Sequence, residues 1–276
     1  MTTVIPSTDP TPSAGPGWRV AIPAAFTLGS LTCAAAAAFS LVTMGWDPAK
    51  GAVAHPDHLL TTAWLILLAV VFDILDGFMA RLFKAASPFG AQLDSLADAM
   101  SFGAAPALLV AAAGRGAIGT TLAALLVFWT ATIRVARYNA EKTSVGPALH
   151  FKGLITPGAG GALATWILLA HFVAGPSLLL GGLAPEVRAA IAAAMQGWLP
   201  LYAVLLSGLM LSDRRYVDLP KHYYRGLWPW YHLVGALVLG LAFGPEPVLA
   251  IAFLAYALSG LLGGRFDTAR DAVTFS

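Results

Sequence analysis

Residues 70–106 read VVFDILDGFMARLFKAASPFGAQLDSLADAMSFGAAP, an apolar stretch interrupted by four carboxylates within 26 residues. These carboxylates belong to Asp73, Asp76, Asp94 and Asp98. Ionised carboxylates at membrane depth are costly, so they are expected only where they face an internal cavity and a cation compensates them. The stretch therefore predicts two membrane helices that hold divalent metal between them.

The composition of the whole chain is that of an integral membrane protein. Of its 276 residues, 58% are hydrophobic and 11% are charged, and the mean hydropathy is +0.74. A soluble domain of this length is far less apolar. The net charge of +2 is small, and no basic stretch is interleaved with aromatic residues, so we predict no nucleic-acid partner.

Runs of about 20 mostly apolar residues predict an all-α, polytopic bundle of about eight transmembrane helices. They cover residues 21–44, 58–84, 92–113, 117–139, 155–174, 190–211, 228–243 and 246–263. The last two are short and are separated by Gly244 and Pro245, so one re-entrant hairpin is an alternative. Residues 1–17 predict a disordered leader, residues 18–265 a single membrane domain, and residues 266–276 a cytoplasmic tail.

The distribution of positive charge orients this bundle. If the N-terminus is cytoplasmic, thirteen Lys and Arg residues fall on the cytoplasmic side and three on the other. The positive-inside rule then predicts an inner-membrane protein whose termini and aspartates face the cytoplasm. The thirteen are Arg19, Arg81, Lys84, Arg134, Arg137, Lys142, Lys152, Arg214, Arg215, Lys221, Arg225, Arg265 and Arg270.

The spacing of the aspartates predicts a metal site. Asp73 and Asp76 are three apart near the end of the second predicted helix, and Asp94 and Asp98 are four apart near the start of the third, so each pair shares a helical face. A Ser-Pro pair at residues 87–88 turns the chain back, so the two pairs face each other. Ligands that are all oxygen suit Mg²⁺ or Mn²⁺. Two such ions would clamp a diphosphate, which predicts phosphoryl transfer.

Two other interpretations of the aspartates remain open. In the first, the acids pair with neighbouring cations in a solvated network between helices; those cations are Arg81, Lys84, Arg134 and Arg137. Alternatively, the protein is a cation-coupled transporter, in which acids are expected throughout the membrane depth. Here all four acids cluster near one face.

The string from Asp73 to Asp98 resembles the complete signature of the CDP-alcohol phosphotransferase family, D-x2-D-G-x2-A-R-x8-G-x3-D-x3-D. The resemblance implies a helical bundle, usually a homodimer, that transfers a phosphatidyl-type group from a CDP-linked donor to an alcohol and releases CMP. It implies metal ligation of two ions by the first three aspartates, with Asp98 as general base and further candidate ligand. The positions that it places beside the CDP donor are Gly77, Ala80, Arg81 and Gly90.

Sequence around the signature is similar to the phosphatidylserine synthase branch of that family. The similar segments are residues 22–33, 93–107, 134–139 and 151–154. This similarity implies CDP-diacylglycerol and L-serine as substrates. The chain departs from the branch at residues 155–157, which read Ile-Thr-Pro where the branch usually has a proline directly after F-K-G-L.

A serine acceptor needs a cation for its carboxylate. Arg134 and Arg137 lie three apart near the cytoplasmic end of the fourth predicted helix, and Lys152 and His150 are further candidates. The alternative is that these residues anchor the protein to lipid headgroups. Glycerol 3-phosphate, inositol phosphate and choline stay open as acceptors, although choline would favour an aromatic cage.

Overall fold

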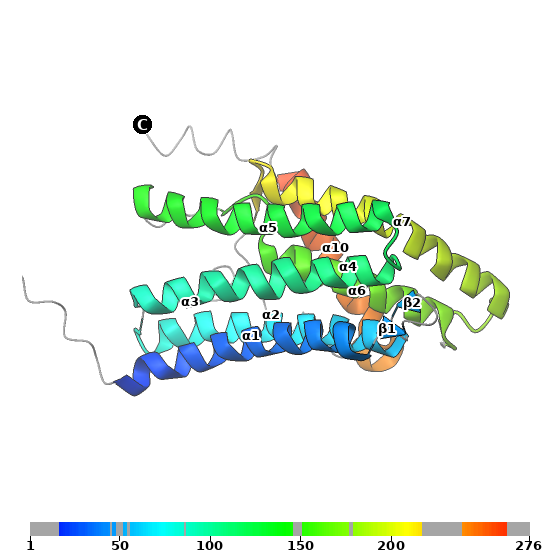
Figure 1. The fold of residues 1–276 in the computed structure, drawn as a ribbon, viewed down its shortest axis with the longest axis horizontal. Helices are drawn as coiled ribbons and strands as arrows, with labels where there is room; N and C mark the ends of the chain where they lie inside the picture. The colour runs from blue at the N-terminus through cyan, green and yellow to red at the C-terminus, as the bar shows by residue number, and fades with distance from the viewer. Residues whose placement is uncertain are drawn as a thin grey trace, which may run out of the picture.

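A computed structural model describes residues 17–44, 46–47, 52–53, 56–85, 87–145, 151–176, 179–216 and 239–263. Within these residues the fold is a bundle of long helices that lie side by side (Figure 1). Six helical segments of this described part are long and apolar enough to cross a membrane. The protein is therefore a multi-pass helical membrane protein, as its composition predicts.

The described helices have the following order in the chain. They are α1 (Gly17–Met44), α2 (Pro56–Leu82), α3 (Pro88–Asp98), the π-helical segment η1 (Ala99–Ala104), α4 (Ala105–Ala113), α5 (Ile118–Val145), α6 (Thr156–Ala174), α7 (Pro185–Leu211) and α10 (Pro245–Gly263). Because α3, η1 and α4 continue one another, they form a single span. Four two-residue strands form two antiparallel pairs. One pair is β1 (Trp46–Asp47) with β2 (Ala52–Val53), and the other is β3 (Phe151–Lys152) with β4 (Arg215–Tyr216).

Seven of the eight predicted helices are confirmed, with shifted ends. The third begins four residues early, because Ser87 caps it and Pro88 occupies its first turn. The sixth also begins earlier than predicted, at Pro185, because proline is favoured in the first turn of a helix. Of the predicted helix at 228–243, residues 239–243 are helical. The rest of that helix, residues 1–16 of the leader and the tail lie outside the described residues.

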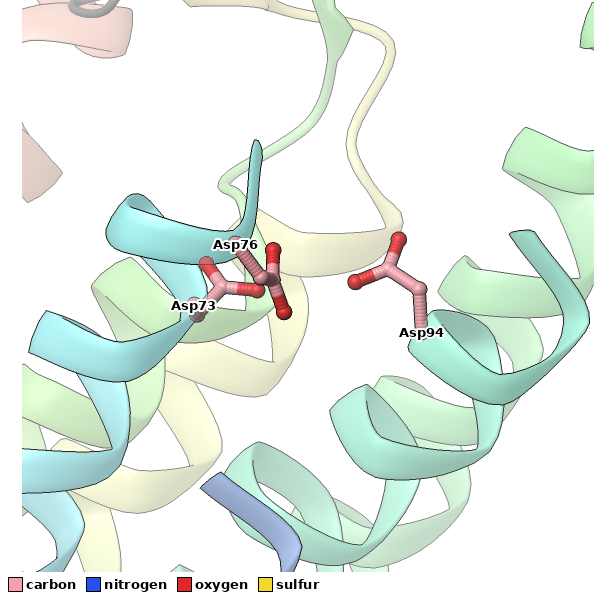
Figure 2. A group of neighbouring side chains, drawn as sticks. All are labelled: Asp73, Asp76 and Asp94. Carbon is pink, nitrogen blue, oxygen red and sulfur yellow. The ribbon is translucent and has the colours of Figure 1, made fainter. Parts of the chain in front are cut away.

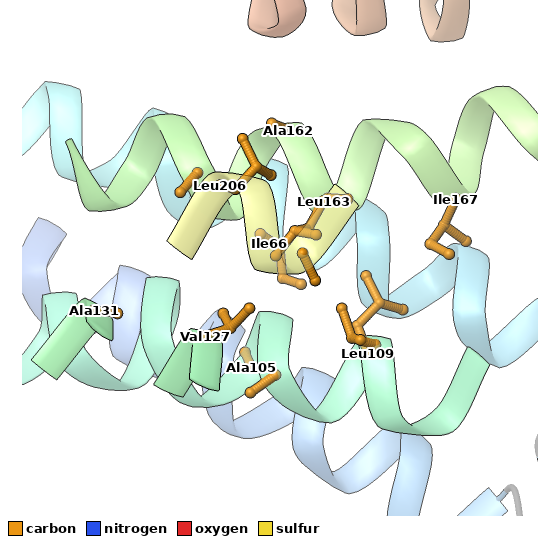
Figure 3. Close-up of a cluster of buried hydrophobic side chains, with 14 of the residues drawn as sticks. Ile66, Ala105, Leu109, Val127, Ala131, Ala162, Leu163, Ile167 and Leu206 are labelled. Atoms are coloured by element: carbon orange, nitrogen blue, oxygen red, sulfur yellow. The ribbon is translucent and has the colours of Figure 1, made fainter. Parts of the chain in front are cut away.

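The centre of the bundle is a cluster of buried aliphatic side chains. Ile66 of α2, Leu109 of α4, Val127 of α5, Leu163 of α6 and Leu206 of α7 all belong to it (Figure 3). Most of α6 between its first turn and Ala170 is buried. This helix lies between the others because its small residues let neighbouring backbones approach closely.

Helix α10 packs against α6 through glycine. A Cβ on Gly158 would lie 2.8 Å from Cε1 of Tyr256, and one on Gly161 would overlap the ring of Phe253. The Tyr216 hydroxyl also contacts α10 and donates a hydrogen bond of 3.1 Å to the carbonyl oxygen of Ala257. Burial raises the pKa of Tyr216, so its phenol stays a neutral donor. These contacts fix α10 beside the start of α6.

Gly153, the third residue of the F-K-G-L segment, has a conformation that only glycine adopts easily. Its φ is +77°, and a Cβ would overlap the carbonyl oxygen of Met210 at the end of α7. We therefore expect Gly153→Ala to lower the free energy of unfolding by roughly 2 kcal/mol or more. Thermal unfolding in detergent micelles measures this effect.

The matched control is Gly208→Ala in α7, where a Cβ meets nothing within 4 Å. We expect that change to be neutral or to stabilise the helix by up to about 1 kcal/mol. Equal unfolding temperatures for the two variants would contradict the role given to Gly153.

Candidate metal and phosphoryl-transfer site

The turn between α2 and α3 brings the two acidic helix faces together. Helix α2 ends at Leu82, and Ser87 caps the start of α3. Ser87 is extended, and its hydroxyl accepts a 3.0 Å hydrogen bond from the Gly90 amide. A Cβ on Gly90 would lie 3.1 Å from that hydroxyl oxygen. Gly90 thus makes room for the Ser87 cap of α3. This role is separate from the contact with the CDP-linked donor that the sequence predicts for Gly90.

Three of the four aspartates form one group. Carboxylate oxygens of Asp73, Asp76 and Asp94 all lie within 4.8 Å of one another. Figure 2 shows Asp73 and Asp76 projecting from α2 towards Asp94, which reaches across from α3. Opposite ligands of one Mg²⁺ ion are about 4 Å apart, so the group has the dimensions of a divalent metal site.

The burial of Asp76 supports the same conclusion. Asp76 is only 7% exposed, and its Oδ2 atom has no hydrogen-bond partner in the part of the chain that is described. An ionised oxygen without a partner is expensive to bury. Three clustered carboxylates also repel one another, so a cation bound between them removes both costs. The donor set, which is all oxygen, fits Mg²⁺ or Mn²⁺.

Asp98 lies one helical turn beyond Asp94, outside the group of three. Its side chain is a hydrogen-bonding neighbour of Asp73, and the guanidinium of Arg134 lies close enough to attract it. Asp98 therefore lies near both the acidic group and a cation.

The two candidate acceptor arginines lie in different surroundings. Arg134 is 7% exposed, and its Nε atom has no hydrogen-bond partner within the described ranges. Arg137 forms an ion pair with the exposed carboxylate of Asp213, just after α7, and contacts the Leu211 carbonyl. Arg134 is an electrostatic neighbour of Asp98.

The remaining site residues predicted from the sequence are those beside the CDP donor and two further candidates for the acceptor site. A Cβ on Gly77 would lie 3.6 Å from Nη1 of Arg81, so the guanidinium extends along this bare face of α2. Ala80 lies in the same turn of the helix. The backbone of Lys152 pairs with β4, whereas its side chain and His150 lie outside what the structure describes.

Two features of the site have no obvious sequence signal. The π-helical segment η1 begins directly after Asp98, and such segments are frequent at functional sites. Within it, Ser101 exchanges hydrogen bonds with Ser30 of α1, at 3.0 Å between hydroxyls and 3.2 Å to the Ser30 carbonyl. Thr27, one turn earlier in α1, is a side-chain neighbour of Asp76. Helix α1 thus supports both halves of the acidic site.

Comparison with known proteins agrees with this geometry. A family model described as CDP-alcohol phosphatidyltransferase matches residues 20–209. A CDP-diacylglycerol–serine O-phosphatidyltransferase of Helicobacter pylori is 34% identical over 172 residues, which are 59% of this chain and 63% of that protein. One of Methanocaldococcus jannaschii is 29% identical over 205 residues, 74% of this chain and 84% of the relative. The chain thus matches less than two thirds of the Helicobacter protein's length.

Proposed function

The chain belongs to the CDP-alcohol phosphatidyltransferase family, and from this premise we propose that it transfers the phosphatidyl group of CDP-diacylglycerol to the hydroxyl of L-serine. The products are phosphatidylserine and CMP. The observation that carries the proposal is the convergence of three signature aspartates within 4.8 Å on two facing helices. The names of the Helicobacter and Methanocaldococcus relatives support serine as the acceptor.

Asp73, Asp76 and Asp94 would hold the two divalent ions. When bound, Mg²⁺ or Mn²⁺ supplies positive charge that neutralises the diphosphate of the donor and the charge that develops on the departing CMP. Arg81, along the bare face at Gly77, binds a donor phosphate, and Ala80 and Gly90 leave room for the nucleotide.

Asp98 accepts the proton of the serine hydroxyl. The hydroxyl oxygen then forms a bond to the phosphorus that carries diacylglycerol, and the bond from this phosphorus to the bridging oxygen breaks, so that CMP leaves with the electron pair. The position of Asp98 beside both Asp73 and Arg134 supports this role, because the hydroxyl must meet the donor and the acceptor site together.

The reaction would take place at the end of the bundle that holds the acidic group. The acidic group lies at the end of the bundle where α2 ends and α3 begins, and α5 ends there too, since Arg137 reaches Asp213 after α7. The excess of cations at this end favours the cytoplasmic side of the inner membrane. The diacylglycerol tails then remain in the bilayer, and we propose a homodimer as the assembled form.

The structure separates the two arginines, and this gives a test of the acceptor site. We expect Arg134→Ala to raise the KM for L-serine at least roughly tenfold, because a carboxylate loses a charged donor. The KM for CDP-diacylglycerol should change much less. Arg137→Ala is the comparison, and its exposed ion pair predicts a small effect on both constants. Equal changes in the two KM values for Arg134→Ala would point to a structural role instead.

An acceptor panel tests the function itself. The purified protein in detergent is given labelled CDP-diacylglycerol with serine, glycerol 3-phosphate, inositol phosphate or choline, and CMP and lipid product are measured. We expect phosphatidylserine in the presence of Mg²⁺ or Mn²⁺ and none with EDTA. Product with another acceptor alone would keep the family chemistry and refute serine. Cation flux in proteoliposomes without CMP release would instead indicate the transporter, which neither the family match nor the relatives support.

A further inference from the structure

Two buried polar atoms near the acids have no hydrogen-bond partner in the described part of the chain. They are Nε of Arg134 and Oγ1 of Thr156. Arg134 is 7% exposed and Thr156 is 0% exposed. Buried polar atoms in native proteins nearly always have partners, and the exceptions need a reason such as an absent ligand. Two of them in neighbouring helices suggest one polar ligand.

The packing of α6 places Thr156 at the depth of Asp98. A Cβ on Gly160 would lie 3.4 Å from the Cα of Phe102 in η1. Helix α6 begins where α5 and α7 end, since the Leu154 amide donates to the Leu209 carbonyl. It therefore runs in the same direction as the α3–η1–α4 span. One turn back from Gly160 is Thr156, and about one turn back from Phe102 is Asp98.

Helix α10 adds a third polar group at this place. The ring of Tyr256 lies over the first turn of α6, with Cε1 at 2.8 Å from the Cβ position of Gly158. Arg134 is an electrostatic neighbour of the same tyrosine. The phenol thus lies near both the start of α6 and the buried guanidinium. Helix α10 also lies beyond residues 20–209, which the family model matches.

We propose that Arg134, Thr156 and Tyr256 together bind the carboxylate of an amino-acid acceptor, and that α10 thereby determines acceptor specificity. This inference rests on the function proposed above. A guanidinium and two hydroxyls supply the several donors that a buried carboxylate requires. Because Arg134 neighbours Asp98, a carboxylate held there leaves the hydroxyl of a short amino acid beside the base.

Such a site rejects acceptors that lack the carboxylate. An amino alcohol such as ethanolamine would leave the buried donors of Arg134 and Thr156 without the carboxylate, and a site built to hydrogen-bond a substrate group discriminates strongly against analogues that lack it. The specificity then depends on residues of three helices that are far apart in the sequence.

The test compares serine and ethanolamine in Tyr256→Phe and Thr156→Val. Each variant keeps the shape of the side chain and removes the hydroxyl. We expect each to raise the KM for L-serine roughly tenfold, with the KM for CDP-diacylglycerol unchanged. The ratio of kcat/KM for serine to that for ethanolamine should fall by a similar factor.

Matched controls remove the same atoms elsewhere. Tyr202→Phe alters a tyrosine that stacks on Trp166, and Thr165→Val alters a buried threonine of the same helix α6, whose hydroxyl bonds the Gly161 carbonyl. Neither control should change the selectivity ratio. Serine KM values in the test variants that match those of the controls would overturn the carboxylate site while leaving the proposed function intact. Wild-type protein that makes no phosphatidylserine would overturn both.

Thr156→Ser separates a lost donor from damaged packing. This variant keeps the hydroxyl and loses a methyl group, so its serine KM should stay within about twofold of the wild-type value. Thermal unfolding in detergent reports the stability of all variants. A serine KM for Thr156→Ser as high as that for Thr156→Val would contradict the inference.

Discussion

Asp98→Asn is expected to lower kcat for phosphatidylserine formation by roughly 10²- to 10⁴-fold, which is the contribution of a well-placed general base. The amide has the size of the carboxylate but does not accept the proton of the serine hydroxyl. Since Asp98 lies outside the group formed by the other three aspartates, binding of CDP-diacylglycerol should remain measurable. Initial rates of CMP release and equilibrium binding of labelled donor give the two quantities.

Asp57→Asn is the matched control for this change. Asp57 is an exposed acid in the first turn of α2, at the opposite end of the helix from the cluster. The same chemical change there should leave kcat unaltered. A near-normal rate for Asp98→Asn would remove the base assignment, whereas loss of donor binding in that variant would make Asp98 a ligand instead.

Asp76→Asn should have an effect of similar size for a different reason. It removes a buried charge from the group of three carboxylates, so the affinity for Mg²⁺ should fall at least about tenfold. Activity should fall with it, and added Mg²⁺ should restore part of the rate. Without metal, the variant should be at least as resistant to heat as the wild type, because like charges no longer repel one another.

Activity and stability that change in opposite directions distinguish a functional acid from a structural one. The rate as a function of Mg²⁺ concentration and the unfolding temperature in EDTA are the two measurements. If Asp76→Asn unfolded at a lower temperature than the wild type in EDTA, the carboxylate would be part of a stabilising network with neighbouring cations. Asp57→Asn again serves as the control.

Much of the fold follows from the sequence because a membrane leaves few alternatives. A chain in lipid must satisfy its backbone hydrogen bonds within each span, so apolar runs predict the helices. The apolar runs miss the true starts of two helices, at Pro88 and Pro185, which lie four and five residues before the predicted starts. The π-helical segment η1, which interrupts the third span, cannot be predicted from the pattern of apolar residues. It depends on how Ser101, Phe102 and Gly103 pack against α1, α5 and α6, which are contacts between distant parts of the chain.

In the candidate site, too, local spacing predicts some contacts, whereas others depend on distant parts of the chain. Helical spacing alone brings Asp73 towards Asp76 and Asp94 towards Asp98, and the Ser-Pro turn brings the two faces together. Spacing does not distinguish Arg134 from Arg137, which lie three apart on one helix. Their difference comes from Asp213 after α7, which pairs with Arg137. Tyr256 was not predicted at all, because its place beside Arg134 depends on glycines of α6.

Binding of Mn²⁺ to the purified protein, followed by electron paramagnetic resonance, tests the central claim most directly. The protein in detergent is titrated with Mn²⁺, with and without CDP-diacylglycerol, and Asp76→Asn is compared with Asp57→Asn. We predict saturable binding to wild type and Asp57→Asn, tighter in the presence of the donor, and weaker binding to Asp76→Asn. If Asp76→Asn bound Mn²⁺ as well as the wild type, or if the donor left the affinity unchanged, the three carboxylates would not be the metal site on which the donor is held.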